Sequence, residues 1–191
     1  MTRGPGLDNA ARARIFTALA RGMDLDEVLR RFNLAPDDLK ALFREAAELY
    51  RIREEGCWRL FCDGASRGNP GPAGAGALLQ DPAGHLQAQA SRYLGQTTNN
   101  VAEYQALLLG LELARKRGVR RLQIFLDSQL VTEQLNGRYQ VKSARLRPLW
   151  QQARQELQKF DFFAVKHIER TLNTAADRLA NEAIDRAPKR R

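Results

Sequence analysis

The order of apolar patterns after Cys57 is the feature that most limits what this chain can fold into. Short runs with the two-residue period of strands come first, and helical and strand-like segments then alternate. The expected strands are Trp58–Asp63, Ala75–Gln80, His85–Leu94, Leu122–Leu126 and Phe162–Ile168. The expected helices are Val101–Arg117, Ser128–Leu135, Ala144–Phe160 and Ala175–Ala187. This order predicts an α/β fold, a mixed sheet flanked by helices, with a turn-rich stretch over residues 64–76.

The first 55 residues have the pattern of short helices instead. Asp24 and Glu27 have the spacing of a capping box, and Pro36 suits the first turn of the next helix. The short connection at residues 33–36 resembles that of a helix-turn-helix, although any small helical hairpin has the same pattern. A polar run at residues 51–56 separates these helices from the first strand. We therefore expect a small helical domain at residues 1–55 and a second domain at residues 56–191.

The net charge of +9 is unevenly distributed between these two domains. Residues 1–55 hold ten Lys or Arg against ten Asp or Glu, whereas residues 56–191 hold twenty-one against twelve. The second domain therefore has an electrostatic preference for a polyanion such as nucleic acid, although a basic surface can also serve solubility alone. The first domain has no such preference, so we expect it to make a protein contact or a dimer contact, or to give a modest aid to substrate placement.

Cysteine placement and hydropathy indicate a cytoplasmic protein. Cys57 and Cys62 would lie on opposite faces of a strand, so their side chains would point in directions that do not allow a disulfide. Their spacing also matches no zinc site. We interpret them as thiols of the core. No run approaches the roughly 18 apolar residues of a membrane helix, and the first residues lack the apolar core of a secretory signal.

Four acidic residues lie at the ends of expected elements, and each has an ordinary structural explanation. Asp63 forms a turn dipeptide with the following glycine, and Asp127 could cap the helix after it. Glu103 and Asp177 each complete the spacing of a capping box. Together they predict more, because strand ends and neighbouring helix starts of an α/β sheet can converge in one crevice. Carboxylates so close would repel unless cations lay between them, and oxygen ligands alone suit Mg²⁺ or Mn²⁺.

Four segments resemble, in the same order, the successive motifs of type 1 ribonuclease H. They are Asp63–Gly71, Thr97–Tyr104, Asp127–Gln129 and Asn173–Asn181, and the resemblance covers about residues 57–187. It implies the ribonuclease H fold, a five-stranded mixed sheet whose first three strands are antiparallel. It also implies that Asp63, Glu103, Asp127 and Asp177 bind the metal ions.

The implied activity is endonucleolytic hydrolysis of the RNA strand of an RNA–DNA hybrid. Two metal ions about 3.5–4 Å apart can stabilise both the attacking and the departing oxygen of such a reaction. By the family pattern, Asp63 bridges both ions. His167 matches a family histidine that moves a proton or helps product leave, although a surface imidazole is the alternative. We expect His85 to be a surface residue.

The implied substrate contacts are polar groups that sense 2′-hydroxyls in a shallow minor groove. The turn at Gly68 and Asn69, together with Asn100 and Gln129, matches these contacts. Thr98 and Asn99 match the family's contacts to a phosphate of the DNA strand. Ordinary turn and capping chemistry is the alternative for all of them.

The chain departs from well-known family members in two places. Between Asp127 and Phe162 it lacks a basic insertion dense in tryptophan and lysine, and residues 1–55 do not resemble the family's hybrid-binding domain. Two rival functions follow. A non-catalytic hybrid-binding module of the same fold would be favoured by the loss of any one acid, and none is missing. A nuclease acting on DNA is disfavoured by the motifs at residues 68–71 and 97–100.

Overall fold

The chain forms two compact units in the computed structural model, residues 1–54 and residues 55–191. We call them the N-terminal unit and the C-terminal unit. The structure describes residues 7–54 and 56–187, and side chains are described outside residues 48–55. Within these residues, every helix is too short or too polar to cross a membrane.

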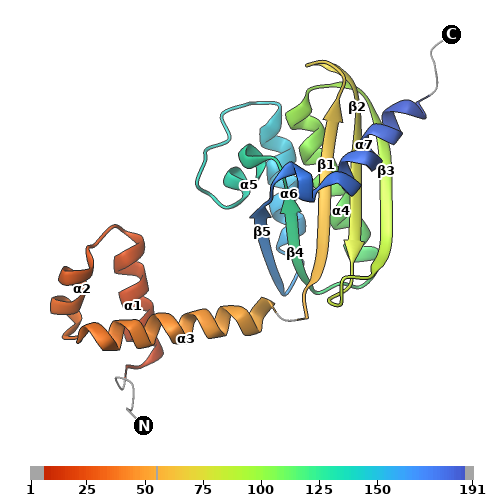
Figure 1. The fold of residues 1–191 in the computed structure, drawn as a ribbon. Helices are drawn as coiled ribbons and strands as arrows, with labels where there is room; N and C mark the ends of the chain where they lie inside the picture. Colours follow the sequence, from red (N-terminus) through yellow and green to blue (C-terminus); the bar gives the residue numbers. More distant parts are fainter. Residues whose placement is uncertain (1–6, 55, 188–191) are drawn as a thin grey trace. The chain divides into compact units, whose positions relative to one another are not determined.

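The described residues of the N-terminal unit form three helices, α1 (Asn9–Ala20), α2 (Leu25–Phe32) and α3 (Pro36–Glu54) (Figure 1). The capping of α2 agrees with the sequence, because the Asp24 carboxylate accepts a hydrogen bond from the Glu27 backbone N–H at 2.9 Å. The helix α3 starts at the expected proline but continues to Glu54. The expected polar connection at residues 51–56 is therefore largely helical.

A small apolar core holds the three helices together. Its fully or nearly buried members come from all three helices: Ile15, Val28, Leu39 and Leu42. Partly buried apolar side chains from the helices and their connections pack around them. This core is separate from the larger core of the C-terminal unit.

The C-terminal unit is built on a five-stranded mixed sheet. Its strands are β1 (Trp58–Ser66), β2 (Gly71–Gln80), β3 (Leu86–Thr97), β4 (Arg121–Leu126) and β5 (Phe162–His167). Their spatial order is β3-β2-β1-β4-β5. The first three strands are antiparallel to one another, and β4 runs parallel to both β1 and β5. The expected five-stranded mixed sheet is thereby confirmed.

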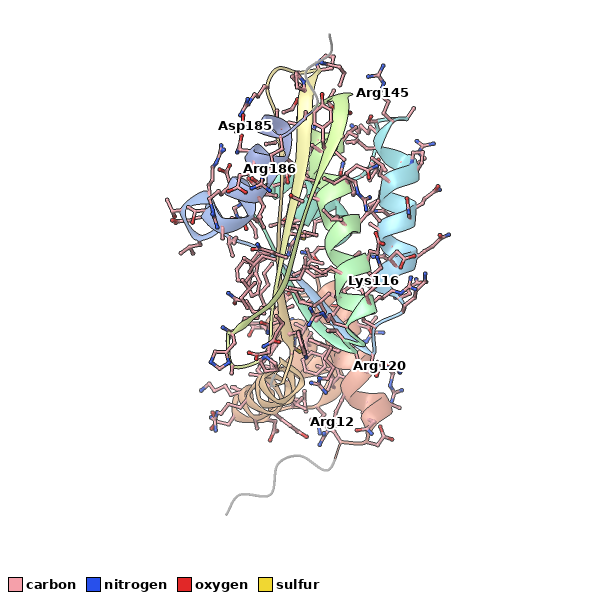
Figure 2. All side chains as sticks on the ribbon, turned by 90° about the vertical axis from the view of Figure 1, so that its right-hand side faces the viewer. Arg12, Lys116, Arg120, Arg145, Asp185 and Arg186 are labelled. Carbon is pink, nitrogen blue, oxygen red and sulfur yellow. The ribbon has the colours of Figure 1, made fainter. Side chains whose placement is uncertain are left out.

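Helices cover both faces of this sheet. They are α4 (Asn99–Lys116), α5 (Gln129–Leu135), α6 (Leu146–Leu157) and α7 (Thr174–Asp185), with a short 3₁₀ turn, η1 (Arg170–Leu172). Figure 2 shows the sheet edge-on, with α7 on one side and α4 and α6 on the other. The core lies between the sheet and α4, where Leu60, Tyr104 and Ile124 are fully buried.

The stretch at residues 64–76, expected to be rich in turns, is mostly strand. Only residues 67–70 lie between β1 and β2. The small residues serve close helix packing instead. A Cβ added at Gly64 would lie 2.1 Å from the backbone carbonyl carbon of Ala102, and one added at Gly76 would lie 2.3 Å from the Ala176 oxygen. These glycines therefore let α4 and α7 approach the sheet closely.

The two cysteines are as expected. Cys57 and Cys62 are both buried, and neither forms a disulfide. The C-terminal unit thus keeps both thiols inside the protein.

Candidate active site

Sheet register places two of the expected acids side by side. In the parallel pair of β1 and β4, Cys62 lies opposite Leu126, so the next residues are Asp63 and Asp127. Asp63 does not end the strand or form a turn with the following glycine, as expected from the sequence, because β1 continues to Ser66. Its relation to Asp127 does not depend on that boundary, since the register alone brings the two carboxylates together.

Two helices add the remaining acids. Glu103 comes from the first turns of α4, and Asp177 comes from the first turn of α7. Carboxylate oxygens of Asp63, Glu103 and Asp127 all lie within 4.8 Å of one another. Asp177 lines the same crevice, which has a volume of about 220 Å³. The structure therefore brings all four sequence-predicted acids to one place.

The capping roles considered for these acids are wrong. The helix α4 has Thr98 at its N-cap, and α7 has Asn173 there, neither with a capping side-chain hydrogen bond. The helix α5 is capped by Ser128, whose hydroxyl oxygen accepts a hydrogen bond from the Val131 N–H at 3.4 Å. In none of the three helices does an acid of the cluster occupy the N-cap or the third helical position that a capping box requires.

Burial and mutual repulsion disfavour the ionised form of these carboxylates when no cation is bound among them. Burial, and then the charges of Asp127 and Asp177, raise the pKa of Asp63 to about 7. Burial, and then the charges of Asp63 and Asp127, raise the pKa of Glu103. The Glu103 Oε2 atom is buried and has no hydrogen-bond partner among the described residues. A cation would relieve both the repulsion and the unsatisfied oxygen, so the residues present fit a bound divalent metal ion.

Three polar residues that sequence reasoning did not assign hold the acids in place. The Asn173 Nδ2 atom donates to the Cys62 carbonyl oxygen and to Asp127 Oδ1, both at 2.9 Å. Arg170 donates to Asp177 Oδ1 at 2.8 Å, and Asn181 donates to Asp177 Oδ2 at 3.3 Å. The two asparagines lie inside a motif used above, so their position was a signal. The arginine lies in η1, which no sequence pattern indicated.

The two histidines have different surroundings. His167 is exposed at the end of β5, and its Nε2 atom lies 3.2 Å from the Asp127 carbonyl oxygen. It therefore stands beside the acidic cluster without lining the crevice. His85 is an exposed side chain of the β2–β3 hairpin, 3.4 Å from the Asp81 carboxylate, which confirms it as a surface residue.

The expected substrate contacts lie around the crevice. Asn99 lines it, and its Nδ2 atom donates to Glu103 Oε1 at 3.4 Å. The Asn99 backbone N–H donates to Asn69 Oδ1 at 3.3 Å, which ties the β1–β2 turn to the start of α4. The other expected contacts stand outside the crevice, in that turn and at the starts of α4 and α5: Gly68, Thr98, Asn100 and Gln129.

Comparison with known proteins agrees with this geometry. Residues 61–183 match the family model described as "Reverse transcriptase-like". A ribonuclease H of Coxiella burnetii is 30% identical over 152 residues, which cover 72% of this chain and 96% of that protein. The ribonuclease HI of Halobacterium salinarum is 43% identical over 127 residues, 66% of this chain and 64% of that protein. This chain belongs to the type 1 ribonuclease H family.

Solved structures extend the comparison to the ribonuclease H fold. The crystal structure of RNase H1 from Halobacterium salinarum superposes with a TM-score of 0.68 and 42% identity, over 69% of this chain and all of that one. LC11-RNase H1, solved in complex with an RNA/DNA hybrid, gives a TM-score of 0.65 and 37% identity, over 67% of this chain and 96% of that one.

In some relatives, the region that matches this chain is only part of a longer protein. A bifunctional protein of Mycobacterium tuberculosis is 45% identical over 127 residues, which are 65% of this chain and 35% of that protein. The matched part of this chain thus spans about a third of that relative's length.

Proposed function

We propose that this chain is an endoribonuclease that hydrolyses the RNA strand of RNA–DNA hybrids. The observation that carries the proposal is the convergence of four carboxylates in one crevice, three of them with oxygens within 4.8 Å, in a chain of the ribonuclease H family. The net positive charge of the C-terminal unit favours a polyanionic substrate. The solved hybrid complex of LC11-RNase H1 supports the choice of substrate.

The acids are suited to hold two Mg²⁺ or Mn²⁺ ions when substrate is present. Asp63 is central, because its carboxylate lies close to those of Glu103 and Asp127 and the charge of Asp177 helps to raise its pKa. Divalent ions, when bound, activate the attacking water and stabilise charge on the departing oxygen. Asn173 and Asn181 orient the ligand carboxylates through the hydrogen bonds described above.

His167 is the proposed proton carrier. Its exposed imidazole stands beside Asp127, so it can exchange protons with solvent and with a group bound at the crevice. It contacts the Asp127 backbone carbonyl rather than a carboxylate, so the ring can move without disturbing the acids. We assign it to proton transfer at the leaving oxygen or to product release.

Hybrid recognition is assigned to the polar residues around the crevice. Asn100, Gln129 and the turn at Gly68 and Asn69 are exposed and available to ribose 2′-hydroxyls. Thr98, with its neighbour Asn99, is assigned to a phosphate of the DNA strand. Asn99 also contacts Glu103. Binding of the DNA strand at Asn99 would therefore affect the position of the Glu103 carboxylate directly.

A substrate panel tests the proposal. The full chain is incubated with end-labelled RNA–DNA hybrid, duplex DNA, duplex RNA and each single strand, with Mg²⁺, with Mn²⁺ and with a chelator. Metal-dependent cleavage confined to the hybrid's RNA strand is expected. Tight hybrid binding without cleavage under any metal would favour the non-catalytic module, and cleavage of duplex DNA would favour the DNA nuclease. The proposed cytoplasmic location is checked separately by cell fractionation.

A further inference from the structure

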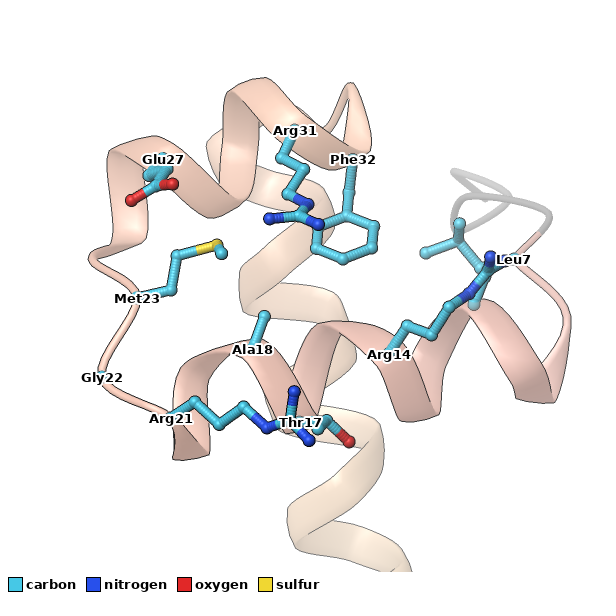
Figure 3. Close-up of a pocket in the computed structure, with 11 residues that line it drawn as sticks. Leu7, Arg14, Thr17, Ala18, Arg21, Gly22, Met23, Glu27, Arg31 and Phe32 are labelled. Atoms are coloured by element: carbon cyan, nitrogen blue, oxygen red, sulfur yellow. The ribbon is translucent and has the colours of Figure 1, made fainter.

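A groove of about 890 Å³ in the N-terminal unit lies outside the chemistry proposed above. It runs between α1 and α2, and Figure 3 shows Met23 and Phe32 facing Ala18 across it. Together with Leu7, these side chains form its floor. All four are only partly buried, although each packs against the small apolar core. The floor of the groove therefore exposes apolar surface to water, and surface of this kind often marks an interaction site.

Three arginines line the rim of this groove. Arg14 extends from α1, Arg21 extends from the C-cap of that helix, and Arg31 extends from α2 on the other side (Figure 3). All three are exposed, and no described acid forms an ion pair with any of them. By contrast, Arg12 on the same helix pairs with Glu45 at 2.6 Å. Cations left unpaired on both sides of an apolar floor indicate an anionic partner that also has an apolar face.

The spacing of the arginines fits an elongated partner. Arg14 lies in α1 and Arg21 is the C-cap residue of that helix, seven positions later, so about 10 Å separates them along the axis. Arg31 supplies charge from the facing helix. A segment lying in the groove could thus place acidic side chains on both flanks while an apolar side chain contacts the floor.

We propose that this groove binds an acidic, amphipathic peptide segment of a partner protein. Asp or Glu side chains of the segment pair with the three arginines, and one large apolar side chain packs on Met23 and Phe32. Charge complementarity carries the choice of partner, since the rim presents three arginines against one acid, Glu27.

Nucleic acid fits the same surface less well. The first turn of α2 carries Asp26 and Glu27, and the first turn of α3 carries Asp37 and Asp38. These carboxylates would repel a continuous phosphate backbone laid across the unit, whereas a peptide needs charge only where the arginines are. A phosphate backbone also has no apolar group to cover the floor.

Peptide selection on the full chain tests the proposal without assuming a sequence. A phage-displayed library of random peptides of about 16 residues, which span about 24 Å as a helix, is selected on the immobilised protein. Enriched peptides are synthesised with a fluorescent label, and their affinity is measured by anisotropy. The groove variant is Arg14→Glu with Arg21→Glu. The matched control is Arg30→Glu with Arg44→Glu, which makes the same charge change at exposed arginines that do not line the groove.

Enriched peptides are expected to combine several acidic residues with a large apolar one. Their affinity should fall about tenfold or more in the groove variant, because repulsion replaces attraction, and stay within about twofold in the control. Hybrid cleavage should be the same in both. A milder pair, Arg14→Gln with Arg21→Gln, replaces the groove variant if circular dichroism shows that it is unfolded.

Three outcomes would overturn the proposal. The first is selection of basic or uncharged peptides, or of none. The second is equal loss of affinity in the groove variant and the control, which would show that the peptide binds through the overall positive charge and not at the groove. The third is an affinity for RNA–DNA hybrid that falls in the groove variant but not in the control, which would make the groove a nucleic-acid site.

Discussion

The side-chain amide of Asn173 donates a hydrogen bond to Asp127 Oδ1 at 2.9 Å, and the same nitrogen donates to the Cys62 carbonyl oxygen at 2.9 Å. One buried asparagine at the start of α7 thereby fixes a carboxylate beyond β4 and the backbone of β1. The orientation of Asp127 depends on a residue that binds no metal itself.

Replacement of Asn173 by Ala should impair both stability and catalysis. A buried carbonyl and a carboxylate lose their donor, so the free energy of unfolding should fall by about 1–3 kcal/mol. The rate should fall about 10- to 100-fold, because small misplacements of reacting groups are costly. Urea unfolding and steady-state cleavage of hybrid measure the two effects.

The matched control for this prediction is Asn136→Ala. The Asn136 side chain donates to the Val165 carbonyl oxygen at 3.2 Å and touches no acid of the cluster. It should lose stability but little activity. Equal loss of activity in both variants would show that Asn173 acts only through general stability.

The metal-free protein should become less stable as the pH rises through about 7. The pKa of Asp63 is raised from 3.8 to about 7 in the folded state, so the folded state holds a proton that the unfolded state has released. Stability is therefore full below the unfolded pKa and is lost as Asp63 ionises. With chelator present, the melting temperature should fall between about pH 4 and pH 7 and change little above that range. Mg²⁺ or Mn²⁺ should raise it more at the upper pH, since cations bind the ionised carboxylates.

Asp63→Asn tests the origin of this pH dependence. The amide cannot ionise, so the metal-free variant should melt higher than the parent near pH 8 and show a flatter pH profile. Asp161→Asn, at an exposed acid paired with Arg120, serves as the control and should keep the slope. An unchanged slope in Asp63→Asn would assign the effect to other groups.

Replacement of His167 by Ala should slow turnover without preventing metal binding. Positioned proton transfer is typically worth about 10²–10⁴-fold, and the imidazole stands beside Asp127. His85→Ala removes an exposed imidazole far along the sheet and should be neutral. A His167→Ala enzyme as fast as the His85→Ala enzyme would make both histidines mere surface residues.

Residues 1–54 should be dispensable for the chemistry. The four acids and all expected substrate contacts belong to the C-terminal unit, and each unit has its own apolar core. A chain starting at Glu55 should fold and cleave hybrid at saturating substrate within about tenfold of the full rate, roughly 1.4 kcal/mol in barrier. Loss of hybrid binding with folding intact would show instead that the N-terminal unit grips nucleic acid.

The sequence predicted the order of strands and helices because each has a clear apolar period. The predicted bounds of these elements were wrong where the composition was ambiguous. The main case is residues 64–76, whose glycines suggested turns. There the glycines make room for α4 and α7, a requirement set by packing between distant segments. The helix α1 was not singled out at all.

The acids of the candidate site could be predicted from the sequence, but the residues that hydrogen-bond to these acids could not. Asp63 and Asp127 could be placed together because parallel strands end at one edge of a sheet. The contact between Asn173 and Cys62 joins residues 111 positions apart, so no local pattern shows it. Arg170 was missed for the same reason, since its role depends on the position of Asp177 in space.

The metal-ion assignment is tested most directly by comparing the full chain with its Asp127→Asn variant, purified in parallel, on one end-labelled RNA–DNA hybrid with Mn²⁺. Asp127→Asn keeps the size of the side chain and removes the charge that would hold a cation. The metal-ion assignment predicts that the parent cuts the RNA strand alone and leaves 3′-hydroxyl ends, while the variant binds hybrid and cuts it orders of magnitude more slowly. Near-normal cleavage by Asp127→Asn, or cleavage by the parent in the presence of a chelator, would contradict it.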